Sequence, residues 1–184
     1  MALHKTGLRC LILVLLCVLS GCMRVPDGAE PVTDFELVRY LGQWYEIARL
    51  DHRFERGLTD VRAEYSLRPD GSIRILNRGY DPEKGEWREA EGRATPAGEA
   101  GEGRLGVSFF GPFRSAYNII ALDREHYRWA MVCGPNVNYL WILSREPTLP
   151  DEIYDALVDE ARQLGFPVDD LIRVLHDRAD STDD

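Results

Sequence analysis

The chain has 184 residues, of which 45% are hydrophobic and 29% charged, a composition typical of a soluble globular domain and unlike that of a disordered, collagen-like or multi-pass membrane protein. Its 22 basic and 31 acidic side chains give a net charge of −9, and only two of the basic residues, Lys5 and Lys84, are lysines. Because no basic field is available to hold a phosphate backbone, nucleic acid is not an expected partner.

The N-terminal segment has the pattern of a removable targeting signal. Lys5 and Arg9 are followed by an unbroken apolar run at 10–19. As a helix this run would be about 15 Å long, half the thickness of a bilayer core, so it is typical of a signal peptide and not of a membrane span. The Leu-Ser-Gly-Cys sequence at 19–22 resembles the lipobox of bacterial lipoproteins, whose cysteine is acylated and becomes the new N-terminus. Met23 stands where that class carries an inner-membrane retention aspartate, so the resemblance implies lipid anchoring in the outer membrane, facing the periplasm. The alternative is an ordinary secretory signal with a chance cysteine.

The expected division of the chain follows from this signal. Residues 1–21 form the signal peptide, 22–34 a lipidated spacer, 35–176 one folded domain and 177–184 an acidic, disordered tail. Removal of the signal leaves 20 basic and 31 acidic side chains, a net charge of −11.

The four cysteines cannot form an internal disulfide in the mature protein. In the lipoprotein that the lipobox resemblance implies, Cys10 and Cys17 leave with the signal and Cys22 is acylated, so Cys133 remains alone. Cys133 ends the apolar run 129–133, which predicts a buried small side chain. No motif supplies the activating neighbour that a nucleophilic cysteine needs.

The expected domain is a series of short strands separated by Gly, Pro, Asp and Asn turns. One strand shows strict alternation, with Val61, Ala63 and Tyr65 on the apolar face. Short connections predict antiparallel neighbours, and eight strands with one apolar face can close into an up-and-down barrel able to hold a small ligand. The expected strands are at about 43–50, 59–68, 72–80, 86–95, 104–110, 115–122, 127–133 and 138–145. Small residues on one inward face, Ala90, Gly92 and Ala94, are expected to leave room inside.

After the strands the apolar period changes from two to 3.6, which predicts a helix packed outside the barrel. Thr148 to Asp151 has the form of a capping box, and Gly165 occupies the position of a C-terminal cap. Residues 171–174 are expected to add a last short strand. The predicted apolar stripe of the helix consists of Ile153, Ala156, Leu157, Ala161 and Leu164.

The segment 39–49, with Gly-Gln-Trp at 42–44, resembles the Gly-x-Trp signature that opens the first strand of lipocalins, and it is similar to the bacterial lipocalin and apolipoprotein D branch. Further similarity follows in family order at 51–57, 107–113, 122–123 and 139–145, so that it spans about 35–175. The second signature departs from the usual Thr-Asp-Tyr and retains only Leu-Asp at 122–123. The resemblance implies an all-β, eight-stranded antiparallel lipocalin barrel with one C-terminal α-helix outside, in which Arg145 lies across Trp44 at the closed end. The signature residues are Gly42, Trp44, Asp123 and Arg145.

With Trp44 at the closed end, loops at about 51–58, 81–86, 110–114 and 134–137 surround the mouth. Apolar residues in or beside these loops predict a membrane-touching rim, a contact with a second copy, a ligand gate, or loop anchors that pack on one another. These residues are Phe54, Leu58, Phe110 and Phe113. The interior is expected to carry few charges and to suit an acyl chain, with Tyr65, Val107, Phe109, Tyr139 and Trp141 on the wall. A lipid head group near the mouth could meet Arg53, Arg56 or Arg114, whose alternative role is that of a solvated rim.

Catalytic and metal motifs are not indicated. The segment 106–111 is not Gly-x-Ser-x-Gly, and His52 beside Asp51 has no identifiable nucleophile. The histidines are scattered without metal-ligand spacing, and no cofactor is expected. The leading hypothesis is an outer-membrane-anchored protein that stores or transports fatty acids or lysophospholipids and is not an enzyme. The alternatives are an envelope structural or interaction protein whose barrel is filled by its own side chains, and a carrier of an apolar pigment or tetrapyrrole.

Overall fold

The computed structural model describes residues 23–178. The predicted signal peptide, the predicted acylation site Cys22 and residues 179–184 of the predicted tail lie outside the described residues. Asp177 and Arg178, the first two residues of that tail, donate their backbone N–H groups to Asp60 Oδ1 at 2.9 Å. Within 23–178, no helix is both long enough and apolar enough to cross a membrane.

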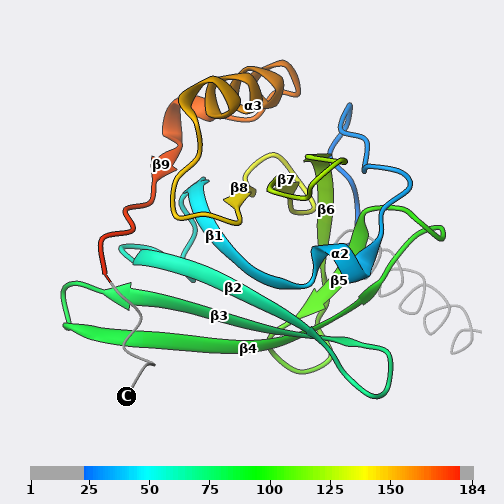
Figure 1. Ribbon diagram of the computed structural model, residues 1–184, viewed down its shortest axis with the longest axis horizontal. Helices are drawn as coiled ribbons and strands as arrows, with labels where there is room; N and C mark the ends of the chain where they lie inside the picture. Colours follow the sequence, from blue (N-terminus) through cyan, green and yellow to red (C-terminus); the bar gives the residue numbers. More distant parts are fainter. Residues whose placement is uncertain (1–22, 179–184) are drawn as a thin grey trace, which may run out of the picture.

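Eight antiparallel strands form one closed barrel (Figure 1). Each strand pairs with the next along the chain, and the pairing of the first strand with both the second and the eighth closes the ring. In Figure 1, β2, β3 and β4 form the side of the ring opposite the helix α3. The strands are β1 (Gly42–Arg49), β2 (Thr59–Leu67), β3 (Ile73–Asp81), β4 (Glu86–Pro96), β5 (Arg104–Ser108), β6 (Ser115–Leu122), β7 (Trp129–Cys133) and β8 (Leu140–Ser144).

All eight predicted strands are confirmed, and the differences at their ends have local causes. The strand β7 begins at Trp129 and not at 127, because Tyr127 has φ +56° and cannot continue an extended chain. The strand β8 begins two residues late because a turn holds Tyr139, whose N–H donates to the Asn136 carbonyl and whose carbonyl accepts from Gly134. The strand β5 ends at Ser108, where the side chain turns to hydrogen-bond the Gly111 carbonyl.

A short helix α2 (Leu37–Tyr40) precedes β1, and the predicted long helix is α3 (Asp151–Gln163). The predicted C-terminal cap of α3 is confirmed: Gly165 has φ +82°, and the N–H of Phe166 donates to the Ala161 carbonyl at 3.1 Å. The predicted capping box at 148–151 was wrong. The N-cap of α3 is Pro150, and no side-chain hydrogen bond caps this end of the helix. The Thr148 carbonyl instead accepts a hydrogen bond from Ser144 Oγ, which ties this residue to the end of β8.

The helix α3 packs on the outer face of the barrel through Leu157 and Ala161, whereas Ala156, predicted for this stripe, is exposed. The layer beneath the helix comes from β1, β6, β7 and β8 and includes the fully buried Cys133, as predicted for that thiol. A 3-10 turn η1 (Val168–Asp170) leads to β9 (Ile172–Arg173), which pairs with β1 and confirms the last short strand.

Candidate functional site

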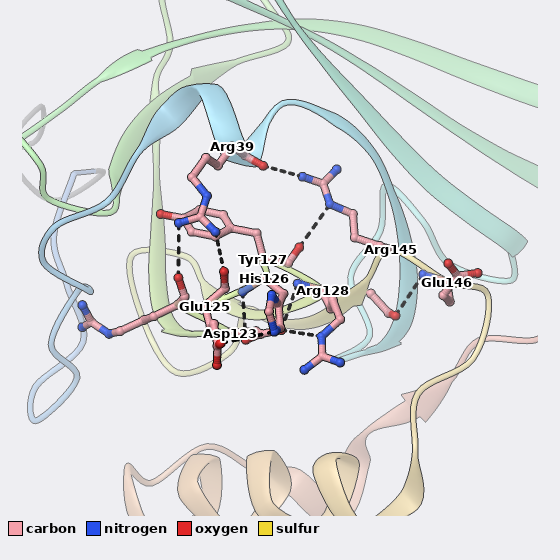
Figure 2. Close-up of polar contacts among 10 residues, drawn as sticks. Arg39, Asp123, Glu125, His126, Tyr127, Arg128, Arg145 and Glu146 are labelled. Carbon is pink, nitrogen blue, oxygen red and sulfur yellow. Dashed lines mark hydrogen bonds and ion pairs between the residues drawn. The ribbon is translucent and has the colours of Figure 1, made fainter.

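The closed end of the barrel is organised around Trp44 and Arg145. The Arg145 guanidinium lies 3.9 Å from the centroid of the Trp44 ring, a cation–π contact. Arg145 Nε and Nη2 donate to the carbonyls of Tyr127 and Arg39 at 3.2 and 2.8 Å (Figure 2). Its Nη1 donates to the Gln43 carbonyl at 2.7 Å. The arginine therefore joins the chain before β1, the start of β1 and the turn before β7.

The contact of Arg145 with Trp44 forms a plug at the closed end, and two further signature residues, Gly42 and Asp123, support it. Gly42 has φ +93°, and a Cβ built on it would lie 3.4 Å from Arg145 Nη1, so glycine suits both the backbone conformation and the close approach. Asp123 accepts from the N–H groups of His126 and Arg128 and from Arg128 Nε (Figure 2). Burial opposes ionisation of Asp123, but these hydrogen bonds prevail and hold its pKa below its usual value.

Above the plug, three tyrosines form the lower part of the interior. The Tyr117 hydroxyl lies 2.7 Å from that of Tyr40 and 2.9 Å from that of Tyr65. Burial raises the pKa of all three, so each hydroxyl remains neutral and the chain of hydrogen bonds satisfies them. Tyr65, predicted for the ligand wall, thus lies inside the barrel, with 5% of its surface exposed.

The upper wall is aromatic and partly accessible. Val107, Phe109 and Trp141, all predicted for the wall, are half-buried and pack against the interior core cluster together with Ala63. Tyr139 lies just before β8, with its ring stacked on that of Trp141 at 6.3 Å.

The small residues of β4 leave less room than expected. A Cβ built on Gly92 would lie 2.7 Å from Phe109 Cε1, so the Phe109 ring occupies the space over this glycine. Ala94 is fully buried, and only Ala90, nearer the mouth on the same face, is exposed. A ligand that reached the lower interior along β4 would therefore have to displace the Phe109 ring.

The prediction of an interior with few charges was wrong. Arg49 and Glu46 form a buried ion pair at 2.6 Å, and Arg49 Nη2 donates to the carbonyls of Glu55 and Leu58. The Glu55 carboxylate in turn accepts from Trp141 Nε1 at 3.2 Å, and its Oε2 lies 2.8 Å from Nε2 of the buried His52. This cluster ties the loop between β1 and β2 to the inner wall.

The pKa values of the two carboxyl groups in this cluster are shifted in opposite directions. Burial and the neighbouring Glu55 carboxylate raise the pKa of Glu46 well above its ordinary value of 4.5, against the opposing effect of Arg49. Burial also opposes ionisation of Glu55, but His52 and Trp141 prevail and lower its pKa. Burial therefore favours the protonated form of Glu46, whereas the partners of Glu55 favour its carboxylate.

Sequence reasoning could have found part of this cluster and missed the rest. Alternation from Trp44 already places Glu46 on the inward face of β1. A bulge between Glu46 and Ala48 then shifts the register, so Arg49 follows Glu46 on the inner side. Nothing in the local sequence predicts that bulge.

At the mouth, three of the four predicted rim residues are exposed. Phe54, Phe110 and Phe113 have exposed fractions of 52%, 68% and 77%, and the rings of Phe54 and Phe110 stack at 6.3 Å. Leu58 does not belong to the exposed rim: it is buried at 9% and packs as a loop anchor on β3, where a Cβ built on Gly79 would lie 3.0 Å from Leu58 Cδ1.

The three arginines predicted for head-group contact have different surroundings. The Arg53 guanidinium lies 4.7 Å from the Phe54 ring centroid. Arg56 pairs with Asp51 at 2.7 Å, and Arg114 hydrogen-bonds Thr95 Oγ1. A lipid head group would therefore contact Arg56 and Arg114 while these arginines also contact Asp51 and Thr95. Across residues 23–178, no group of three His, Cys, Asp or Glu side chains is placed to hold a metal ion.

Comparison with known proteins agrees with this geometry. The family described as the lipocalin-like domain matches residues 35–176. The chain is 53% identical over 165 residues to the outer membrane lipoprotein Blc of Vibrio cholerae, covering 89% of this chain and 96% of that protein. It is 54% identical over 149 residues to the protein of the same name from Escherichia coli K12, covering 81% and 84% of the two chains.

More distant similarity extends to animal proteins. Apolipoprotein D of Rattus norvegicus is 34% identical over 157 residues, covering 77% of this chain and 82% of that protein. Insecticyanin from the tobacco hornworm Manduca sexta superposes with a TM-score of 0.67 at 21% identity, covering 86% of this chain and 88% of that one, and supports the fold alone. The chain therefore belongs to the lipocalin family, a family of binding proteins rather than enzymes.

Proposed function

We propose that this lipocalin binds fatty acids or lysophospholipids inside its barrel and is held at the periplasmic face of the outer membrane by acylated Cys22. The outer membrane assignment is supported by the names of the Vibrio cholerae and Escherichia coli relatives and by the lipobox pattern at 19–22. Several acyl chains on one cysteine would anchor the protein stably, since each buried methylene contributes about 0.8 kcal/mol.

The observation that carries the ligand proposal is the half-buried apolar wall in the upper interior. Ala63, Val107, Phe109 and Trp141 pack on the interior core yet keep part of their surface accessible. Because the side chains of this wall are mostly apolar, an acyl chain that lay along it would gain about 0.8 kcal/mol of binding free energy per buried methylene. The head group would remain near Arg53, Arg56 and Arg114 at the mouth.

The test is a titration of the detergent-extracted lipoprotein, stripped of bound lipid, with a fluorescent long-chain fatty acid. Ala63→Trp narrows the interior, whereas Glu64→Trp puts the same ring on the exposed outer face of β2, one residue away. Binding should be lost in Ala63→Trp and retained in Glu64→Trp. Unchanged binding in Ala63→Trp would place the lipid elsewhere.

Native mass spectrometry of the protein extracted from its membrane would identify the ligand class. A retained fatty acid or lysophospholipid supports the proposal. No retained lipid and no fatty-acid binding at micromolar concentration would favour an envelope structural protein with a self-filled barrel, and coloured purified protein would favour a pigment carrier.

A further inference from the structure

The open end of the barrel carries an exposed aromatic rim, which we define as Phe54, Phe110 and Phe113. These side chains come from the loop between β1 and β2 and the loop between β5 and β6, and none is more than half-buried. Solvated loop tips ordinarily carry polar residues, and grouped exposed aromatic rings mark a contact surface. The stacking of Phe54 on Phe110 brings both loops into the same patch.

Basic groups accompany this rim although the mature chain is acidic. Arg53 lies over Phe54, and Arg114 follows Phe113. Below the 109–114 loop, on the outer face of β4 and β5, an open hollow of about 580 Å³ is lined by Arg114. Arg68 and Arg93 line its far side, where they pair with Glu91 and Asp70 toward the closed end. Aromatic rings beside arginines match a phospholipid surface, whose interface accepts rings and whose phosphates attract cations.

Followed from Val32 back to Met23, the N-terminal segment runs along the outer wall of the barrel in the direction of the mouth. Near the closed end, Val32 exchanges hydrogen bonds with Gly103 and Ile119. Earlier in the chain, Arg24 and Met23 lie farther up the outer wall, where their carbonyls accept from Asn118 and Arg104.

At the start of the described chain the segment reaches the middle of β5. A Cβ built on Gly106 would lie 3.0 Å from Met23 Cε and 2.8 Å from Arg114 Nη2. Met23 thus packs beside a rim arginine, two residues along β5 from its mouth end at Ser108. The proposed acylation site is the preceding residue, and consecutive Cα atoms are about 3.8 Å apart.

From these observations we propose that the aromatic rim docks on the phospholipid bilayer that holds the anchor, so that the mouth of the barrel opens onto the membrane surface. The inference rests on the proposed acylation of Cys22. A tethered protein meets its membrane at a high effective concentration, so three phenylalanines are sufficient for a contact that would be weak without the tether. A lipid ligand could then pass between bilayer and barrel without crossing water.

Two equally exposed positions at opposite ends provide a matched test. Phe113 on the rim is 77% exposed, and Val38 on α2 at the closed end is 76% exposed. Phe113→Cys and Val38→Cys in the full lipoprotein would each receive a nitroxide label, with Phe110→Cys as a second rim position. Cys133 is buried and should not react, and circular dichroism would check the fold of each variant.

The labelled proteins are reconstituted into vesicles of phosphatidylethanolamine and phosphatidylglycerol. At both rim positions, oxygen should relax the label more strongly than a water-soluble nickel chelate, and the order should be reversed at position 38. The proposal is overturned if the protein floats with the vesicles while the rim labels are as accessible to nickel as the label at 38. Dipolar broadening between rim labels would identify a second copy as the occupant and overturn it too.

Failure of the protein to float with vesicles would remove the anchor on which the inference depends. Fatty-acid binding by the same samples in detergent separates the two proposals, because loss of rim docking with intact binding leaves the proposed ligand site standing.

Discussion

Arg145→Ala should destabilise the barrel more than any other single arginine truncation at the closed end. The substitution removes a cation–π contact with Trp44 at 3.9 Å and three hydrogen bonds to backbone carbonyls. The cation–π contact is worth about 1–2 kcal/mol when the ring is buried, as Trp44 is. Because the guanidinium is only half-buried, water can replace it at the carbonyls, and each hydrogen bond counts for only about 0.5 kcal/mol.

The expected loss in unfolding free energy is therefore about 3 kcal/mol, which corresponds to a Tm lower by roughly 6–12 °C for a domain of this size. Arg145→Lys should lose about half as much, because an ammonium keeps the charge near the ring and lacks the planar fork that reaches three carbonyls. Urea denaturation followed by circular dichroism would measure both.

The control is Arg124→Ala at the same end, which removes one exposed hydrogen bond to the Thr33 carbonyl and should cost about 0.5 kcal/mol. An Arg145→Ala loss no larger than that of Arg124→Ala would refute the plug as a source of stability.

Three further outcomes follow from the site. Gly42→Ala should lower the unfolding free energy by about 1–3 kcal/mol because alanine is strained at φ +93°; chemical denaturation would show it, and a neutral substitution would contradict the strain. For Glu46, the raised folded-state pKa means that the carboxyl stabilises the fold below its ordinary value of 4.5 and that this contribution is lost as pH rises through the folded pKa. Glu46→Gln should therefore become progressively more stable relative to the parent as pH rises above 4.5, and a difference independent of pH would mean that folding does not raise the pKa of Glu46. Burial raises the pKa of Cys133 to about 12, so a thiol reagent at pH 8 should label it only after denaturation, and rapid labelling of the native protein would exclude this packing.

The buried cluster gives the loop between β1 and β2 a mechanical role. Arg49 donates hydrogen bonds to the carbonyls of Glu55 and Leu58 in this loop. Trp141 on β8 donates another to the Glu55 carboxylate. Phe54, on the rim, belongs to the same loop. The interior charges therefore position part of the rim, and their cost of burial is offset by mutual hydrogen bonds.

Local sequence information was sufficient for the elements and the closed end. Alternation such as that of Val61, Ala63 and Tyr65 located the strands, and the change of period after β8 located α3, because both patterns report which face meets the core. Gly42, Trp44 and Arg145 were recognised through their family resemblance, and the structure places them in contact.

Tertiary structure alone decided how the interior is filled. The bulge in β1 that places Arg49 beside Glu46 depends on pairing with β8, and the position of Phe109 over Gly92 depends on the contact between β4 and the end of β5. It likewise brought Met23 beside Gly106 in the middle of β5 and buried Leu58 against Gly79. Each of these outcomes joins residues distant in the chain, and a one-residue change of register, which no local pattern encodes, exchanges the inner and outer faces of a strand.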